Sequence, residues 1–229
     1  MKVAERYSKK GVHFVDLDSA FARATKYAAP GQDLFLEHVH FNIDGHGLVA
    51  QTLSQSIVEK ICSRTWNENR VSSDRERDQW LGLLIEDEIV ACTLAGLLSQ
   101  TPPFDLAVDL TRQKRILETR VENLAKSLPD DRREIFAQLN GKTRMDDMVD
   151  GIGRVYLERG DAKRALQFFE LGNRRRPWMP NSLVFSAVSL EKLKRFEDAR
   201  TAISQSAQTT LSATAPLAKV RNDLARRLR

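Results

Sequence analysis

The sequence predicts a mainly α-helical protein with a short α/β segment at its amino-terminal end. Of its 229 residues, 29% are charged and only 7% are aromatic, a composition that favours helices over a β-sandwich or barrel. Apolar residues recur every three or four positions through most of the chain. After residue 145 the pattern also repeats with a period of about 34 residues. A hydrophobic content of 41% is enough to build a core.

Residues 1–73 predict a partial α/β domain, in the order helix, strand, loop and helix. Gly11 precedes Val12–Leu17, a run that is apolar on both faces, as in a strand buried within a parallel sheet. A loop at residues 36–45 then leads into an amphipathic helix over residues 46–62. The apolar side chains of that helix are Leu48, Val49, Leu53, Ile57 and Ile61. Because an unpaired strand exposes its backbone groups, this segment needs a sheet from elsewhere.

Residues 74–144 predict a helical connector. Helical periodicity runs over residues 74–100, 105–127 and 129–139, and a Pro-Pro pair breaks it after the first stretch. None of the three stretches has the spacing of the repeat that follows. We therefore expect helices that support the repeat without belonging to it.

Residues 145–229 contain two copies of one helical pattern. In each copy, small residues stand where two antiparallel helices would approach each other, and large apolar residues fill the space between them. The first copy, residues 146–179, carries Val149, Ile152, Gly153, Tyr156, Gly160, Ala165, Phe169, Gly172 and Pro177. The second copy, residues 180–213, carries Leu183, Ser186, Ala187, Leu190, Lys194, Ala199, Ile203, Ser206 and Leu211. This pattern resembles the tetratricopeptide repeat, which implies a helical docking surface for a protein or peptide.

The resemblance also implies a terminal helix and a ligand-facing surface. Residues 214–229 have the spacing of a helix that covers the last repeat. Because two repeats are fewer than the roughly three that such arrays need, we expect the connector helices to pack beneath them. The first helix of each repeat would line the concave face with Asp147, Asp150, Arg154, Glu158, Asn181, Val188, Glu191 and Lys192. Their mixed charge indicates a polar peptide as the ligand.

Three of the four histidines fall between Leu34 and Ala50, and one of them follows an acid by three residues. Glu37 precedes His40 by three residues, on the predicted loop. A carboxylate at this spacing can hold an imidazole and orient it as a general base. In a loop, however, a pair at this spacing is usually solvated and has no catalytic role.

The stretch around this pair resembles the carboxy-terminal block of the SGNH, or GDSL-type, hydrolases, in which Asp-x-x-His is followed by a glycine and a helix. Glu37 stands at the acid position, His40 at the base position and Gly45 at the turn glycine. Leu48–Ala50 matches the start of the closing helix, and Val12–Leu17 resembles the strand that precedes the block. The resemblance implies a flavodoxin-like α/β fold and hydrolysis of an ester or acyl bond without a cofactor. More narrowly, the chain resembles the carboxy-terminal portion of bacterial proteins that join such a domain to tetratricopeptide repeats.

The sequence departs from the family pattern in several ways. Glu37 is one methylene longer than the usual aspartate, and Phe41 follows His40 where proline is common. The blocks with the nucleophilic serine, the oxyanion-hole glycine and the asparagine are expected before this point, so about a quarter of the hydrolase domain is represented. Ser19 follows an aspartate, as the family's nucleophile does, but a leucine replaces the preceding glycine. A triad without its nucleophile loses on the order of a million-fold in turnover, so we expect this chain alone to be inactive.

A metal site is an alternative use of the same stretch. His38, His40, Asp44 and His46 offer imidazole and carboxylate ligands that suit zinc, but their spacing fits no familiar zinc motif. We therefore expect no metal. The two cysteines are far apart in helical, apolar stretches and are predicted to be free thiols.

Charge and hydropathy argue against nucleic-acid and membrane functions. The net charge of +5 is modest, and basic residues are mixed with acids except at Arg174–Arg176 and in the last helix. Without interleaved aromatic residues, the arginine run is interpreted as a solvated helix end before Pro177. No uncharged apolar run reaches the roughly 18 residues that a membrane span needs. A cytoplasmic location is the default expectation.

Two hypotheses follow. In the first, these residues are the carboxy-terminal part of a hydrolase, and a preceding portion or another chain supplies the sheet and the serine. In the second, the protein is a non-catalytic tetratricopeptide scaffold with a vestigial hydrolase segment. An upstream in-frame Gly-Asp-Ser block would favour the first, and an exposed front in the isolated chain would favour the second.

Overall fold

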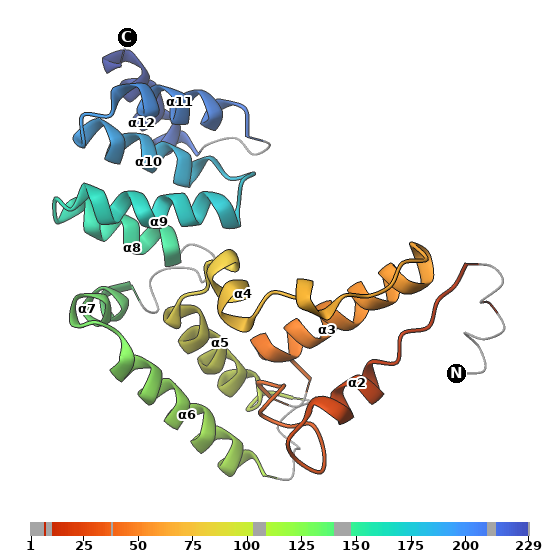
Figure 1. Ribbon diagram of the computed structural model, residues 1–229. Coiled ribbons are helices and arrows are strands. Elements are labelled where there is room, and N and C mark those ends of the chain that lie inside the picture. The colour runs from red at the N-terminus through yellow and green to blue at the C-terminus, as the bar shows by residue number, and fades with distance from the viewer. Residues whose placement is uncertain are drawn as a thin grey trace. The chain divides into compact units, whose positions relative to one another are not determined.

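The computed structural model describes residues 7, 11–37, 39–102, 109–139, 148–209 and 214–228. These residues are mainly helical, which confirms the predicted class (Figure 1). Their only β pairing is an isolated antiparallel bridge between Phe35 and Phe41. Contacts divide the chain into two compact units, so the predicted connector is shared between them. The first unit comprises residues 1–83 and 88–124, and the second comprises residues 84–87 and 125–229.

The first unit consists of short helices and long loops. Its elements are α2 (Leu17–Ala24), α3 (Ile43–Ser56), the π-helix η2 (Ile57–Ile61), the 3-10 helix η3 (Glu68–Arg70), α4 (Asp74–Leu81), most of α5 (Ile85–Leu98) and most of α6 (Leu110–Ser127). Helix α3 begins three residues before the predicted start at residue 46. The single helix predicted for residues 74–100 is two helices, because Gly82 adopts a left-handed conformation with φ 65°.

The predicted strand at Val12–Leu17 is not formed. Residues 12–16 have no strand partner in the described part of the chain, and Leu17 already begins α2. Asp16 caps that helix, since its side chain accepts a hydrogen bond from the backbone N–H of Ser19 at 3.0 Å. A strand gains its hydrogen bonds from a neighbouring strand, whereas the cap on α2 is local.

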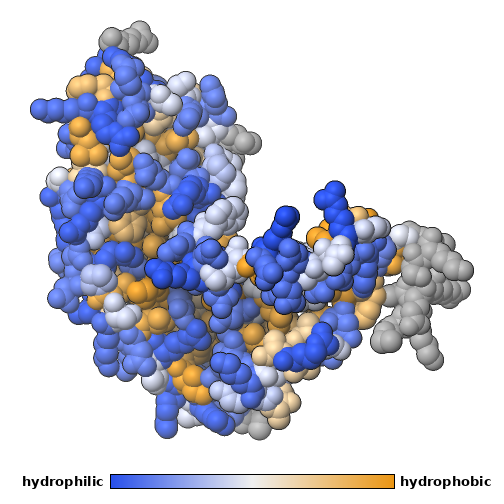
Figure 2. Space-filling view, in the orientation of Figure 1, coloured by the Kyte–Doolittle hydropathy of each residue, from blue (hydrophilic) through white to orange (hydrophobic). Residues whose placement is uncertain are grey.

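The predicted apolar stripe of the helix after the loop is present but uncovered. Leu53, Ile57 and Ile61 follow one another at four-residue spacing on α3 and η2, and 40%, 49% and 61% of their surfaces are exposed. Apolar surface is visible on this helix in Figure 2. Elsewhere in the unit, Leu36 packs against the buried side chains of Cys92 and Leu117 and so holds the loop onto α5 and α6.

The second unit is a series of antiparallel helical hairpins. Its helices are α7 (Asp130–Leu139), α8 (Met148–Glu158), α9 (Ala162–Arg175), α10 (Pro180–Lys192), α11 (Phe196–Ala207) and α12 (Ala215–Arg227). Helix α8 packs against α9, α9 against α10, and α10 against α11. Helices α8 and α9 lie within residues 146–179, and α10 and α11 lie within residues 180–213.

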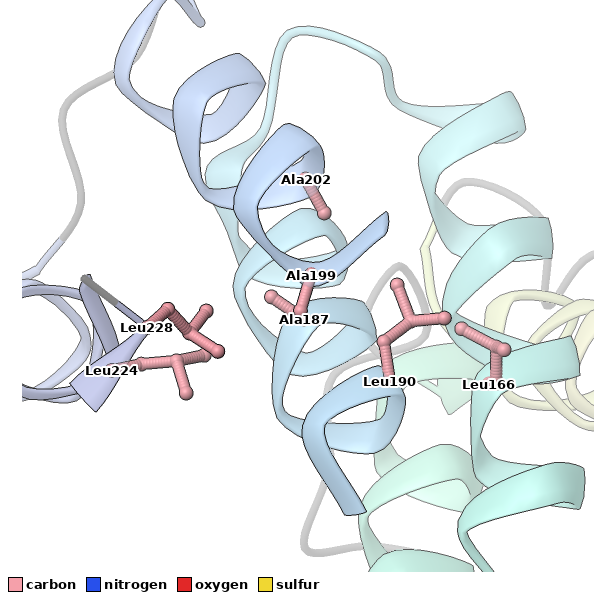
Figure 3. Packing of buried hydrophobic residues seen from close by; sticks show 7 residues of the cluster. All are labelled: Leu166, Ala187, Leu190, Ala199, Ala202, Leu224 and Leu228. Atoms are coloured by element: carbon pink, nitrogen blue, oxygen red, sulfur yellow. The ribbon is translucent and has the colours of Figure 1, made fainter. Parts of the chain in front are cut away.

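Small residues allow the hairpin helices to approach closely. Ala187 and Ala199 are fully buried between α10 and α11, and the leucines of α12 close the same cluster (Figure 3). A Cβ added at Gly153 would lie 2.7 Å from Cε1 of Phe169, which is nearer than real Cβ atoms come. Glycine at this position therefore sets the separation of α8 and α9.

Candidate functional site

The predicted acid and histidine lie at the tip of a tight loop in the first unit. The two arms of the loop meet at the Phe35–Phe41 bridge. The backbone N–H of Leu36 donates to the carbonyl of His40 at 2.8 Å, and that of Asn42 donates to the carbonyl of Leu34 at 3.1 Å. These bonds close the loop although its sequence has neither helical nor strand periodicity.

Glu37 and His40 are in direct contact at this tip. Glu37 is buried, with 5% of its surface exposed, and its two carboxylate oxygens accept the backbone N–H groups of Val39 and His40, each at 3.0 Å. Its Oε1 also contacts Nδ1 of the His40 ring. The histidine side chain is 58% exposed. The backbone thus holds the carboxylate in place, while the imidazole is exposed to solvent.

This arrangement matches the chemical requirement for a general base. When Nδ1 donates its proton to a carboxylate, the neutral ring presents the lone pair of Nε2 and can accept a proton there. The carboxylate also stabilises the imidazolium ion that results. A pair in this geometry can act as a general base with the acid that orients it.

A cluster of aromatic rings packs against the loop. Phe21 of α2 lies against Phe41 and Phe35, with ring centroids 4.9 Å and 5.4 Å away, and the latter two rings are 5.0 Å apart. His46, in the first turn of α3, meets Phe41 edge to face at 5.6 Å. These contacts hold both arms of the loop.

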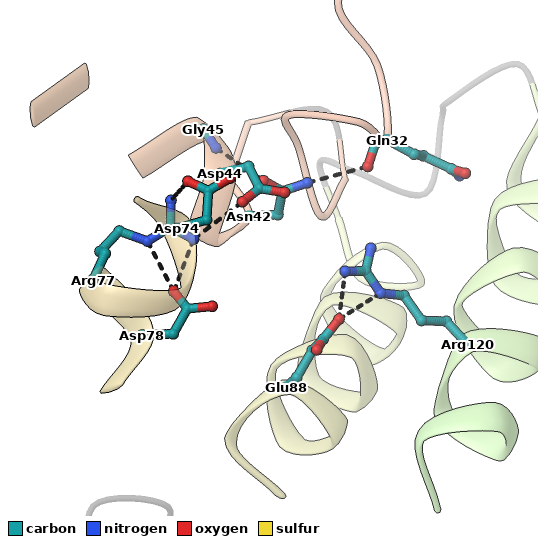
Figure 4. A network of polar contacts seen from close by, with 9 residues as sticks. All are labelled: Gln32, Asn42, Asp44, Gly45, Asp74, Arg77, Asp78, Glu88 and Arg120. Carbon is teal, nitrogen blue, oxygen red and sulfur yellow. Dashed lines mark hydrogen bonds and ion pairs between the residues drawn. The ribbon is translucent and has the colours of Figure 1, made fainter. Parts of the chain in front are cut away.

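Asn42 and Gly45 join the loop to α3. Asn42 is the N-cap residue, and its Oδ1 accepts the backbone N–H of Gly45 at 2.9 Å (Figure 4). A Cβ added at Gly45 would lie 2.1 Å from the carbonyl oxygen of Leu34. Glycine is therefore required at this position, because no side chain fits between the helix start and the loop.

Arg77 of α4 holds the same end of α3. Its guanidinium lies 3.2 Å from Asp44, 3.0 Å from Asp74 and 2.8 Å from Asp78 (Figure 4). Burial by itself would lower the pKa of Arg77, but hydrogen bonds to Asp78 and Asp44, with the attraction of the nearby carboxylates, raise it above its ordinary value. Arg77 is therefore a permanent cation at the first turn of α3.

A cavity of about 830 Å³ lies beside the loop, between its first arm and α6. This volume is within the range of roughly 300–1,000 Å³ that ligand pockets have. The cavity is lined by Tyr27, Pro30, Gly31, Gln32, Asp33, Phe35, Glu37, Asp109, Arg112, Gln113, Ile116 and Arg120. Arg120 is also paired with Glu88 of α5 through its Nε at 2.7 Å (Figure 4). Sequence periodicity gave no sign of this cavity, because it depends on how the loop meets α6.

Ser19 and Asp44, which were also considered from the sequence, have partners within the first unit. The hydroxyl of Ser19 donates to Asp16 Oδ2 at 2.7 Å, in the first turn of α2. Asp44 pairs with Arg77, and His38 lies outside the described residues. Among the residues described, no group of three or more histidine, cysteine, aspartate or glutamate side chains is arranged to hold a metal ion.

The residues predicted to line the concave face of the repeats occupy different environments. Asp147 lies outside the described residues. Arg154 is exposed on α8, with its guanidinium 5.8 Å from the ring of Phe185 on α10, and Glu158 and Lys192 are also exposed. Asn181 is half-buried.

Three of the predicted docking residues have structural contacts. Asp150 is buried, with 3% of its surface exposed, and it bonds Ser182 at 2.7 Å and Arg176 at 3.1 Å. It therefore lies inside the unit, contrary to its predicted place on the concave face. Val188 packs against the core of α9–α12. Glu191 forms a two-pronged ion pair with Arg227 of α12, at 2.8 Å and 2.9 Å.

The arginine run before Pro177 is also more than a solvated helix end. Arg175 reaches Asp87 at 2.5 Å, and Arg176 reaches Asp150, all within the second unit. Next to Asp87, the fully buried Glu86 binds Arg132 through Nε at 2.6 Å and Nη2 at 2.5 Å. These pairs anchor residues 84–87 to the helical hairpins.

No family model, no curated protein and no solved structure matches this sequence. Function is therefore inferred from the geometry of the loop and of the hairpins. In the described residues, no helix is both long and apolar enough to cross a membrane.

Proposed function

We propose that Glu37 and His40 are the acid and the general base of a serine ester or acyl hydrolase of the SGNH type. The observation that supports this most directly is the contact between the buried carboxylate and Nδ1 of the outward-facing ring. Two backbone N–H groups hold the carboxylate, so it keeps its place when the ring gains a proton. A pair on a solvated surface would have no such support.

In the proposed reaction, Nε2 of His40 takes the hydroxyl proton of a serine as its oxygen attacks the acyl carbonyl carbon. The imidazolium is stabilised by Glu37 and gives that proton to the departing alkoxide, which leaves as an alcohol. Water then attacks the acyl-serine, with His40 again accepting and returning one proton. The products are the alcohol, the carboxylic acid and the unmodified serine.

The serine is not assigned to this sequence. The 229 residues contain no Gly-Asp-Ser block, and Ser19 serves in the first turn of α2. The proposal therefore takes the nucleophile from a preceding portion of a longer chain or from another chain. In this proposal the same portion would also cover the apolar side chains that are exposed on α3 and η2, whereas their exposure in the chain alone is what the scaffold hypothesis expects.

The test combines the mass of the native protein with active-site labelling. Extracts of source cells are treated with a fluorophosphonate probe, and antibody against residues 145–229 captures the protein. We expect a labelled band well above the 26.0 kDa of this sequence, or a labelled partner captured with it. His40→Ala should abolish labelling, because the serine then has no base. Absence of labelling in the wild type, with capture complete, would sink the proposal.

The second candidate is a scaffold of tetratricopeptide type, and the architecture of the second unit favours it. Two hairpins and a terminal helix form a core within that unit, independent of the loop. The exposed Arg154, Glu158 and Lys192 on α8 and α10 would face a polar protein or peptide segment. Nucleic acid is not proposed as a partner, and a cytoplasmic location is the accompanying proposal.

Site-specific photocrosslinking tests the scaffold. A photoreactive residue at position 154 should capture a partner in source cells, while the same residue at the exposed Lys163 of α9 should not. Equal capture at both positions would argue against a docking face on α8 and α10. The two candidates are separable, since His40→Ala leaves this crosslink unchanged if docking is independent of hydrolysis.

A further inference from the structure

Asn42 holds three segments of the first unit together, two residues after His40. It is 4% exposed. Its backbone N–H donates to Leu34 at 3.1 Å, its Nδ2 donates to the carbonyl of Gln32 at 3.1 Å, and its Oδ1 accepts the N–H of Gly45 (Figure 4). One side chain thus connects the arm that precedes the loop tip to the helix that follows it.

The bond to Gln32 ties the first arm to the start of α3. Within the arm itself, the backbone N–H groups of Leu34 and Phe35 donate to the carbonyl of Gly31 at 2.9 Å and 2.8 Å. Gln32 and Phe35 line the cavity of about 830 Å³, so open space lies on one side of the first arm. Asp33 fixes the beginning of this arm, through Thr25 Oγ1 at 2.7 Å. Its end is fixed by the backbone bond from Leu36 to His40, and its middle by the bonds of Asn42 to Gln32 and Leu34. The first arm leads directly to Glu37, so its position determines where the carboxylate lies.

We propose that Asn42 is a positioning residue that keeps the carboxylate of Glu37 on Nδ1 of His40. Its donor bond to Gln32 fixes the arm that carries Glu37, and its acceptor bond to Gly45 fixes the arm that carries His40. A role for Asn42 in catalysis rests on the proposed hydrolase function. Its effect on the contact between Glu37 and His40 depends only on the hydrogen bonds and can be measured without catalysis.

The alternative is that Asn42 only caps α3, and two variants separate the roles. Asn42→Asp and Asn42→Ser both keep a side-chain oxygen that caps a helix well. Both lose the amide donor to Gln32, and the aspartate adds repulsion between its carboxylate and that carbonyl. Ser73→Ala is the matched control, because it removes the N-cap of α4, whose side chain accepts from Glu76, and leaves the loop untouched.

The readout is the tautomer of His40 in the ¹⁵N-labelled chain, from long-range ¹H–¹⁵N correlations at a pH where the ring is neutral. The signal is assigned with His40→Gln. The wild type should carry the proton on Nδ1, because Glu37 binds it there. In both Asn42 variants the ratio of Nδ1–H to Nε2–H should fall by about fivefold, the change that one net hydrogen bond produces. Ser73→Ala should leave the ratio unchanged.

The outcomes distinguish the two proposals. A wild-type ring with Nδ1–H that stays so in both Asn42 variants would overturn the positioning role and leave the proposed hydrolase function standing. A wild-type ring with its proton on Nε2 would overturn both. Circular dichroism of each variant verifies that the helices are intact, so a changed tautomer reports the loop.

Discussion

The hydroxyl of Ser182 donates a hydrogen bond to Asp150 Oδ1 at 2.7 Å, in the interior formed by α8, α9 and α10. Arg176 supplies the balancing charge at 3.1 Å. A Cβ added at Gly172 would lie 2.5 Å from the same carboxylate oxygen, so the helices close tightly around it. A buried acid, a buried hydroxyl and a glycine thus join the first repeat to the second.

Asp150→Ala should destabilise the second unit by about 2–4 kcal/mol, because it leaves the half-buried Arg176 and the buried Ser182 without this partner. Asp150→Asn should cost less, since the amide oxygen still accepts from Ser182. Urea unfolding of the full chain measures both. Asp198→Asn, which removes an exposed pair with Arg195, is the control and should change the free energy of unfolding by no more than about 0.5 kcal/mol.

Gly45→Ala and Gly47→Ala should differ although both glycines lie in the first turns of α3. The Cβ of an alanine at position 45 would meet the Leu34 carbonyl at 2.1 Å, and backbone cannot move without breaking the loop. At position 47 it would meet Nη1 of Arg77 at 2.6 Å, the end of a flexible side chain. We expect a loss of at least about 2 kcal/mol for the first and a change within about 1 kcal/mol for the second. Thermal unfolding followed at 222 nm compares them, and equal stability would contradict the close approach.

Tyr156→Phe should make the second unit less sensitive to acid. The hydroxyl of Tyr156 donates to Asp131 at 2.8 Å and, as the largest cause, lowers the pKa of that carboxyl below its ordinary 3.8. Because the pKa of Asp131 is lower in the folded state than in the unfolded state, the ionised carboxylate adds to the free energy of unfolding above pH 3.8. That contribution is lost as the pH falls through the pKa of the folded state. The wild type should therefore have the higher melting temperature at pH 7, and the difference should shrink below about pH 4. A difference that is constant down to pH 2 would exclude this linkage.

The spacing of small and apolar residues predicted the helical hairpins, but it did not predict the ion pairs between helices. The spacing of Gly153, Ala187 and Ala199 reports how near two helices come, and that information is contained in one stretch of sequence. Asp150 was predicted to line the concave face because it lies in the first helix of a repeat, and the pattern gave no sign of Arg176 as its partner. Pairing of this kind depends on tertiary packing, which periodicity does not encode.

At the amino-terminal end of the chain, a local pattern predicted an element that the structure does not contain. The apolar run at Val12–Leu17 predicted a strand, but a strand requires a neighbour, and Asp16 instead caps α2. The loop that follows was identified by the spacing of Glu37 and His40 and by Gly45. Its supports, Asn42 and Arg77, were not identified, because neither belongs to the acid–histidine spacing.

Glu37→Asp tests whether the longer acid is suited to this loop. Glu37 uses both oxygens on backbone N–H groups and still reaches Nδ1 of His40. Shortening the side chain by one methylene forces the carboxylate to give up its contact with either the backbone N–H groups or the ring. This outcome is expected even though aspartate is the usual acid in the proposed hydrolase family. We expect the Nδ1–H tautomer of His40 to be lost and labelling by the fluorophosphonate probe to slow by about 10²-fold, the effect of a displacement near 1 Å. Glu37→Gln keeps the length and removes the charge, but its amide has one acceptor oxygen where the carboxylate uses two. It should therefore lose one of the two backbone bonds as well as the stabilisation of the imidazolium. Wild-type labelling in Glu37→Asp would mean that the loop adjusts to either acid, and that the fit of Glu37 is not what orients His40.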